Sequence, residues 1–216
     1  MSEGSNAITS AADLLTISPV VPVVVIRDAE QAVPLARALV RGGVAVIEIT
    51  LRTEAGLSAI ERVAAEVPEI VVGAGTVTTP KEAAEVTRAG AQFIVLPGSP
   101  ERLLSAAIDT GLPLLPGAST LTEMMRLTEH GLNVMKFFPA EPSGGVAYLS
   151  AVAGPLPQLR FCPTGGISVK TAPNYLALAN VGCVGGSWLT PADAMAAIDW
   201  GRIESLAAEA ATIQPA

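Results

Sequence analysis

The segment Val44-Ala45-Val46-Ile47-Glu48-Ile49 is a run of apolar, mostly β-branched residues that contains a single carboxylate. Strands of a parallel sheet are buried on both faces and therefore show nearly continuous apolar runs rather than alternation. Similar runs recur along the chain and predict strands at Val21–Ile26, Val44–Ile49, Ile70–Gly73, Phe93–Leu96, Pro113–Leu115, Val134–Phe137, Leu159–Cys162 and Val181–Val184. The quoted segment is thus the second of eight predicted strands.

Longer stretches with helical spacing separate these strands, and proline and glycine stand at several of their starts and ends, as capping preferences require. Helices are predicted at 29–40, 54–66, 81–89, 101–110, 121–130 and 145–152, with a short turn near 174–179 and a last helix including 203–212. An extra helix over residues 7–16 is expected before the first strand.

This alternation continues without a linker and predicts one domain over residues 1–216, folded as a (β/α)8 TIM barrel with an extra N-terminal helix. An open doubly wound sheet is the alternative. The eighth strand and the absence of an evident switch point in strand order make that alternative weaker.

The composition excludes several classes of partner. Half of the 216 residues are apolar, 15% are charged, and the formal net charge of −7 leaves no basic field for nucleic acid. The longest apolar runs are less than half of the ~20 residues that a membrane-spanning helix needs. Met1 to Leu15 lacks the features of a secretory signal, and only Cys162 and Cys183 are present, so a reducing cytoplasm is expected.

Two charged residues interrupt apolar strands. Glu48 shares a strand face with apolar neighbours, and Lys136 lies within the run 134–139. The structural explanations are an ion pair between Glu48 and Arg52 and a lysine that reaches solvent past Phe138. The functional interpretation places both groups inside the barrel, where an amine loses its charge more readily, as a Schiff-base nucleophile must, and a carboxylate acts as general acid or base.

Residues that follow the predicted strands are suited to an anionic substrate. Arg52 can hold a carboxylate through two parallel hydrogen bonds, although pairing with Glu48 or Glu54 is an alternative. Thr76 ends the third strand. The segments 164–168 (TGGIS) and 185–187 (GGS) follow the last two strands, where many barrels bind phosphate through backbone amides. Glycines that only provide tight turns are the alternative explanation.

Other motifs carry no function. Residues 73–76 (GAGT) lack the third glycine of a dinucleotide fingerprint, and no P-loop sequence is present. His130 is the only histidine and is expected to cap a helix, so one chain contains neither a histidine triad nor a multi-histidine metal site. Cys162 and Cys183 are expected to fill core space.

Several segments, taken in order and with their spacing, resemble the family of 2-keto-3-deoxy-6-phosphogluconate and 4-hydroxy-2-oxoglutarate aldolases, which are class I Schiff-base aldolases. The resemblance runs from about Thr16 to Ala194. It rests on Val44–Thr53 (VAVIEITLRT), Val72–Val77 (VGAGTV), Lys136–Ala140 (KFFPA), Phe161–Ile167 (FCPTGGI) and Gly185–Leu189 (GGSWL).

The resemblance implies a (β/α)8 barrel, a cytoplasmic homotrimer and activity without a metal ion or organic cofactor. It implies reversible cleavage of 2-keto-3-deoxy-6-phosphogluconate to pyruvate and D-glyceraldehyde 3-phosphate in the Entner-Doudoroff pathway. The implied roles are Schiff base for Lys136, acid/base for Glu48, carboxylate binding for Arg52 and Thr76, pocket lining for Pro97 and Phe138, contact with the sugar hydroxyls for Thr164, and phosphate binding for Gly165, Gly166, Gly186 and Ser187.

Three alternatives stay open at this point. The substrate can be 4-hydroxy-2-oxoglutarate or the galactonate epimer instead. The chain can be a phosphosugar isomerase or synthase that works by proton transfer without a covalent lysine. It can also be a catalytically silent scaffold that binds phosphate.

Overall fold

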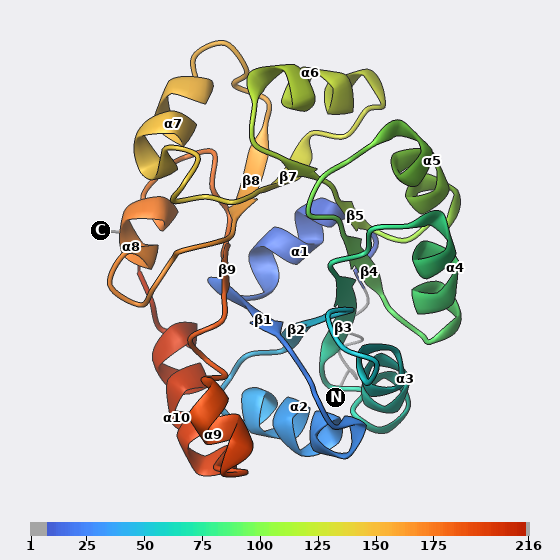
Figure 1. Ribbon diagram of the computed structural model, residues 1–216. Coiled ribbons are helices and arrows are strands. Elements are labelled where there is room, and N and C mark those ends of the chain that lie inside the picture. The colour runs from blue at the N-terminus through green and yellow to red at the C-terminus, as the bar shows by residue number, and fades with distance from the viewer. Residues whose placement is uncertain (1–7, 215–216) are drawn as a thin grey trace, which may run out of the picture.

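Parallel strands and connecting helices alternate through the described residues, 8–214, of the computed structural model. The strands form a curled sheet whose outer face is covered by helices (Figure 1). The elements are α1 (Ala11–Ile17), β1 (Val20–Val24), η1 (Ala29–Gln31), α2 (Ala32–Arg41), β2 (Val46–Thr50), α3 (Gly56–Glu66), β3 (Val71–Gly75), α4 (Pro80–Arg88), β4 (Phe93–Val95), α5 (Glu101–Asp109), β5 (Leu114–Leu115), β6 (Gly117–Ala118), α6 (Leu121–Glu129), β7 (Val134–Phe137), α7 (Gly145–Val152), β8 (Arg160–Pro163), α8 (Ala172–Leu176), β9 (Val184–Gly186), α9 (Ala192–Ala196) and α10 (Trp200–Ala211).

The strand order fixes which residues are neighbours in the interior. One sheet has the order β5-β4-β3-β2-β1-β9 and the other the order β6-β7-β8, with parallel pairing throughout. Parallel bridges Phe161–Val181 and Thr164–Gly185 connect the two sheets beside β8. Glu48 of β2 pairs in register with Val23 and Gly73, and Lys136 of β7 with Gly117 and Cys162.

Burial explains why the apolar runs form these strands. Every residue of β1, β2 and β3 is buried, as expected for strands covered on both faces. The connecting helices bury one face against the sheet, and Thr79 and Thr120 begin α4 and α6 with capping boxes. Within residues 8–214, no helix is both long enough and apolar enough to cross a membrane.

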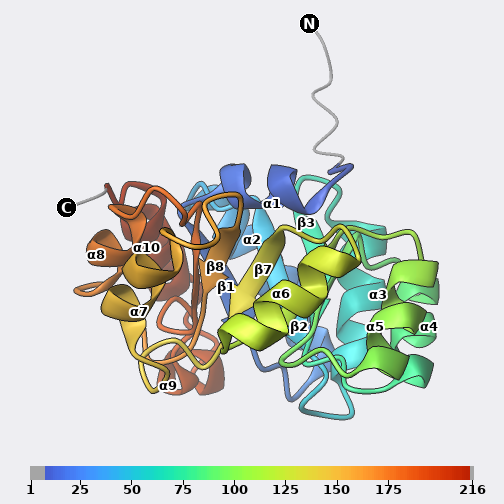
Figure 2. The same ribbon diagram turned by 90° about the horizontal axis from the view of Figure 1, so that it is seen from above.

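The two ends of the curled sheet differ. Helix α1 lies across one end (Figure 1), and Figure 2 shows α9 at the opposite end. Ser10 caps α1 through a capping box with Asp13, and the helix leads directly into β1. The helix begins at Ala11, so residues 8–10 of the predicted helix are not helical, and its predicted start at Ala7 lies outside the described residues. Because α1 covers the ends at which strands begin, the loops that follow the strands are left at the other end.

The prediction for the last strand was wrong about Gly185 and Gly186, which belong to β9 rather than to the following loop. They pair with Val21 and Pro22 of β1. A Cβ at Gly185 would lie 2.1 Å from Thr164 Oγ1, and one at Gly186 would lie 2.2 Å from the Trp188 ring. These glycines are therefore required by close neighbours and not by a turn, which an apolar-run pattern does not detect.

The region after β9 also differs from the prediction. The structure places α9 before α10, and α10 begins at Trp200, whereas only one helix including 203–212 was predicted. Asp199 caps α10 by accepting a hydrogen bond from the backbone nitrogen of Arg202, which sets this earlier start.

The crowding at Gly185 leads to a stability prediction. Gly185→Ala is expected to lower the free energy of unfolding by about 1–3 kcal/mol, because the added methyl group must displace Thr164. Urea denaturation measures this change. Gly98→Ala is the control, since a Cβ there meets nothing within 4 Å, and a change below about 0.5 kcal/mol is expected. Equal effects of the two substitutions would contradict the packing argument.

Candidate active site

Lys136 and Glu48 meet in the interior. Lys136 Nζ donates a hydrogen bond to Glu48 Oε1 at 3.2 Å, and the two residues are 3% and 2% exposed. This geometry replaces both structural explanations considered from the sequence, because Glu48 contacts Lys136 rather than Arg52 and the lysine does not reach solvent. Lys136 Nζ also lies 5.3 Å from the centroid of the Phe138 ring, so an aromatic face covers the amine.

Glycines make room for this pair. A Cβ at Gly75 of β3 would lie 2.1 Å from Glu48 Oε1, so the carboxylate occupies the space that a side chain would fill. Gly117, which pairs in register with Lys136, approaches the backbone of Pro97 so closely that a Cβ would lie 2.4 Å from its carbonyl carbon. Pro97 is thereby placed beside Gly117 of β6, the strand that pairs with the strand carrying the amine.

Arg52 and Thr76 form a second group after β2 and β3. Arg52 Nε donates a hydrogen bond to Thr76 Oγ1 at 3.3 Å. Thr76 has a φ of 56°, a conformation that a β-branched residue rarely adopts and that costs about 1–3 kcal/mol. Such strain is typical of functional positions. A guanidinium and a hydroxyl are thus held together at the open end of the sheet.

The loops after β7 and β8 are tied together by backbone hydrogen bonds. Ala140 N donates to Thr164 O at 2.8 Å, and Glu141 N donates to Gly165 O at 3.0 Å. Gly165 and Gly166 have φ values of 106° and 83°, which favour glycine. A Cβ at Gly165 would lie 3.3 Å from the Phe138 ring, so this glycine pair adjoins the residue that covers Lys136.

Thr164 presents a polar atom without a partner. Its Oγ1 is buried and has no hydrogen-bond partner among the described residues. Buried hydroxyl groups are nearly always hydrogen-bonded, and an exception calls for an explanation such as a bound group. The hydroxyl therefore has both of its hydrogen-bonding functions available for a ligand.

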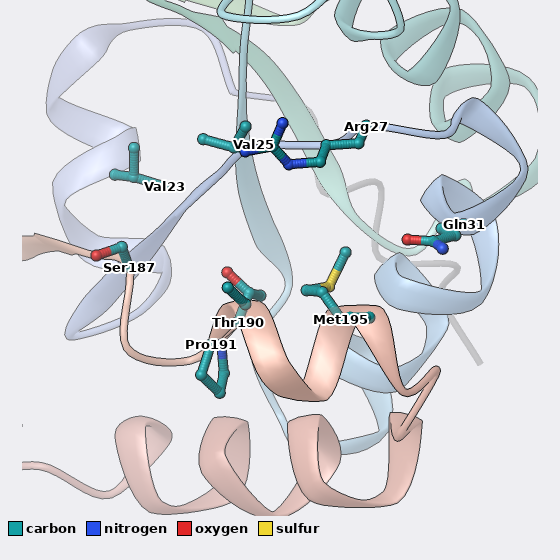
Figure 3. Close-up of a pocket in the computed structure, with 10 residues that line it drawn as sticks. Val23, Val25, Arg27, Gln31, Ser187, Thr190, Pro191 and Met195 are labelled. Atoms are coloured by element: carbon teal, nitrogen blue, oxygen red, sulfur yellow. The ribbon is translucent and has the colours of Figure 1, made fainter.

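A cavity of about 560 Å³ opens beside this site, between the end of β1 and the segment that leads into α9. Figure 3 shows Ser187, Thr190 and Met195 on one side, and the Arg27 side chain running back along the end of β1. Lys136 and Glu48 do not line this cavity. Val23 lines it and pairs in register with Glu48, so the cavity is one strand away from the carboxylate.

Arg27 is the residue that sequence reasoning missed. The sequence analysis gave it no role, although it follows an apolar strand as Arg52 does. That shared position was the available signal. The structure places Arg27 and Ser187 on the same cavity, which brings a guanidinium to the end of the site where the glycine segments also lie.

The thiols of Cys162 and Cys183 are buried near the site. Hydrogen bonding to Cys162 and burial raise the pKa of the Cys183 thiol, and the negative charge of Glu48 acts in the same direction. Cys183 therefore remains a neutral thiol. Cys162 pairs in register with Lys136, and both cysteines are buried in the core, as the sequence predicted.

Comparisons with known proteins agree on one family. The family model described as KDPG and KHG aldolase matches residues 12–206. The 2-dehydro-3-deoxy-phosphogluconate aldolase of Dickeya dadantii (strain 3937) is 58% identical over 202 residues, which cover 94% of this chain and 95% of that protein. The KHG/KDPG aldolase of Escherichia coli (strain K12) is 57% identical over 202 residues with the same coverage.

Solved structures give the same result. The chain is similar to a KDPG aldolase from Legionella pneumophila, with pyruvate captured as a covalent carbinolamine intermediate, at a TM-score of 0.92 and 43% identity. That match covers 94% of this chain and 99% of the other. The corresponding Zymomonas mobilis ZM4 aldolase with 3-phosphoglycerate has a TM-score of 0.91 and 42% identity, covering 97% and 99%.

The buried pair leads to a prediction about unfolding. Lys136→Met is expected to lower the free energy of unfolding by about 3–5 kcal/mol, because Glu48 is left in the core without its partner. The double variant Lys136→Met/Glu48→Gln removes both charges and is expected to recover most of this loss. Urea denaturation of the wild-type protein, Lys136→Met, Glu48→Gln and the double variant measures the complete cycle. Additive losses in the double variant would contradict direct coupling.

Proposed function

The chain belongs to the KDPG and KHG aldolase family, and on that premise we propose how its own residues carry out the reaction. It is a class I aldolase, a carbon–carbon lyase that cleaves 2-keto-3-deoxy-6-phosphogluconate reversibly to pyruvate and D-glyceraldehyde 3-phosphate. The observation that carries the residue assignment is the 3.2 Å contact between Lys136 Nζ and Glu48 Oε1 inside apolar strands.

In this proposal Lys136 is the nucleophile. Its contact with Glu48 lets a proton pass directly from the amine to the carboxylate, and the neutral amine adds to the C2 ketone. Glu48 then returns the proton to the carbinolamine hydroxyl, which leaves as water and forms an iminium ion. Burial of both groups keeps bulk water from competing for these protons.

The iminium ion accepts the electron pair of the bond that breaks. Loss of the proton from the C4 hydroxyl, directly or through a water to Glu48, forms the aldehyde and cleaves the bond between C3 and C4. D-Glyceraldehyde 3-phosphate leaves, and the remaining enamine is protonated at C3. Hydrolysis of the resulting iminium releases pyruvate and restores the Lys136 amine. The same steps in reverse form the carbon–carbon bond.

The substrate's two charged ends are assigned to different parts of the site. Arg52 and Thr76, held 3.3 Å apart, would bind the pyruvoyl carboxylate, with Pro97 and Phe138 lining the pocket. The unpartnered Thr164 hydroxyl would contact the sugar hydroxyls. The phosphate would bind at Gly165, Gly166, Gly186 and Ser187, and Arg27 across the adjoining cavity adds a positive charge.

We further propose that the two sheets form one closed (β/α)8 barrel and a single domain, with α1 as an extra N-terminal helix. The bridges beside β8 and the adjacent positions of β5 and β7 in Figure 1 support closure. The family model spans residues 12–206, in keeping with one domain. By family resemblance, we also propose that the protein is a homotrimer and is located in the cytoplasm.

The assignment of Glu48 is tested by turnover. Glu48→Gln keeps the shape of the side chain but cannot accept a proton, so kcat is expected to fall by about 10²-fold or more. Release of pyruvate from 2-keto-3-deoxy-6-phosphogluconate measures this. The control is Glu54→Gln at an exposed position just after Arg52, for which normal turnover is expected. Near-normal turnover of Glu48→Gln would remove Glu48 from the acid/base role.

The same assay with other substrates measures the substrate specificity of the enzyme. The galactonate epimer tests the orientation of the C4 hydroxyl, and 4-hydroxy-2-oxoglutarate replaces the phosphate end by a carboxylate. Because the proposed phosphate contacts favour the phosphorylated acid, a higher kcat/KM for 2-keto-3-deoxy-6-phosphogluconate is expected. Failure of the wild-type protein to release pyruvate from that substrate would refute the proposed function.

A further inference from the structure

Glu141 and Tyr175 connect two loops at the site but have no part in the reaction described above. Tyr175 Oη donates a hydrogen bond to Glu141 Oε1 at 2.7 Å. Glu141 lies in the loop after β7, and Tyr175 is fully buried in α8, which follows the loop after β8. The hydrogen bond therefore joins the loop next to Phe138 to the helix that follows Gly165 and Gly166.

Glu141 also contacts Gly165 and Gly166 of the proposed phosphate site. Its backbone nitrogen donates to Gly165 O at 3.0 Å. A Cβ at Gly166 would lie 2.8 Å from the Cβ and Cγ atoms of Glu141, so the side chain of Glu141 packs directly over Gly166. Gly145 leaves space for the phenol, since a Cβ there would lie 3.0 Å from Tyr175 Oη. The glutamate is thus held from both sides.

The glycine pair needs such a restraint. Both residues have positive φ, and glycine loses more conformational freedom than any other residue when its backbone is fixed. A phosphate that binds to a mobile pair must also offset that loss, whereas a pair already held in place binds more tightly. A side chain fixed over Gly166 provides this order before the substrate arrives.

The Tyr175 hydroxyl is protonated and can therefore donate the hydrogen bond to Glu141. Burial raises the pKa of Tyr175 well above its usual range, and the hydrogen bond to the Glu141 carboxylate acts in the same direction. The hydroxyl therefore keeps its proton at neutral pH. The acceptor, Glu141, is at an exposed position.

We propose that Tyr175 and Glu141 are positioning residues that fix the Gly165-Gly166 segment for the phosphate group of the substrate. The inference rests on the proposed function, because it assigns these residues to one end of the same site. Neither residue touches the reacting atoms. Their effect is confined to the phosphorylated aldehyde and does not extend to the pyruvate end.

The condensation direction separates the two ends of the site, because each reactant has its own KM. Tyr175→Phe is expected to raise the KM for D-glyceraldehyde 3-phosphate about five- to tenfold, as expected for the loss of one typical hydrogen bond. The KM for pyruvate and kcat are expected to stay within about twofold. Tyr148→Phe is the matched control, since this tyrosine stacks on Phe137 and keeps that ring contact.

Substitutions at exposed Glu141 provide a second arm that does not disturb the core. Glu141→Gln keeps a carbonyl acceptor for the phenol and is expected to raise the same KM less than about threefold, whereas Glu141→Ala is expected to match Tyr175→Phe. The double variant Glu141→Ala/Tyr175→Phe is expected to show no more than the larger single effect.

Three results would overturn the inference. Equal KM values for D-glyceraldehyde 3-phosphate in Tyr175→Phe and Tyr148→Phe, with normal condensation by the wild-type protein, would refute the positioning role alone. A parallel rise in the KM for pyruvate would do the same, because it would indicate a general structural effect. Absence of condensation by the wild-type protein would refute the proposed function together with this inference.

Discussion

The ion pair between Lys136 and Glu48 is the interaction on which the rest of the site depends. Each charge alone would be costly in an interior of apolar strands, and the pair is stable only because the two partners meet at 3.2 Å. This requirement fixes the neighbours. Gly75 must lack a side chain where the carboxylate lies, and β2 and β7 must face each other across the interior. The curled sheet brings together residues that are 88 positions apart.

Around this pair, two separate sets of residues are positioned for the two charged ends of the substrate. Arg52 and Thr76 stand after β2 and β3, while Thr164, Gly165 and Ser187 stand after β8 and β9. Because parallel strands all end at one edge, short loops are sufficient to collect these groups at one end. The division explains why the proposed roles of Glu141 and Tyr175 concern only the phosphate end, since Glu141 contacts Gly165 in the loop after β8 and Tyr175 holds Glu141.

Much of this organisation is visible in the sequence because burial leaves a strong signal. Apolar runs locate the strands, and Glu48 and Lys136 are conspicuous as charges within them. The sequence alone could not decide whether Glu48 pairs with Arg52 or with a group on a distant strand, since that choice depends on how the sheet curls. For the same reason Gly185 and Gly186 were placed in a loop, although they lie in a strand whose neighbours fill the space of a side chain. Arg27 was missed because Ser187, which lines the same cavity, is far away in the chain.

The central claim is that Lys136 forms a covalent bond with the keto acid, and reductive trapping tests it most directly. The protein is incubated with pyruvate and borohydride and then digested, and the masses of its peptides are measured by mass spectrometry. The account predicts the mass of a reduced pyruvate imine on the peptide that carries Lys136, with the exposed Lys81 unmodified and no adduct in Lys136→Met. An adduct on another lysine, or full activity with no adduct at all, would contradict it.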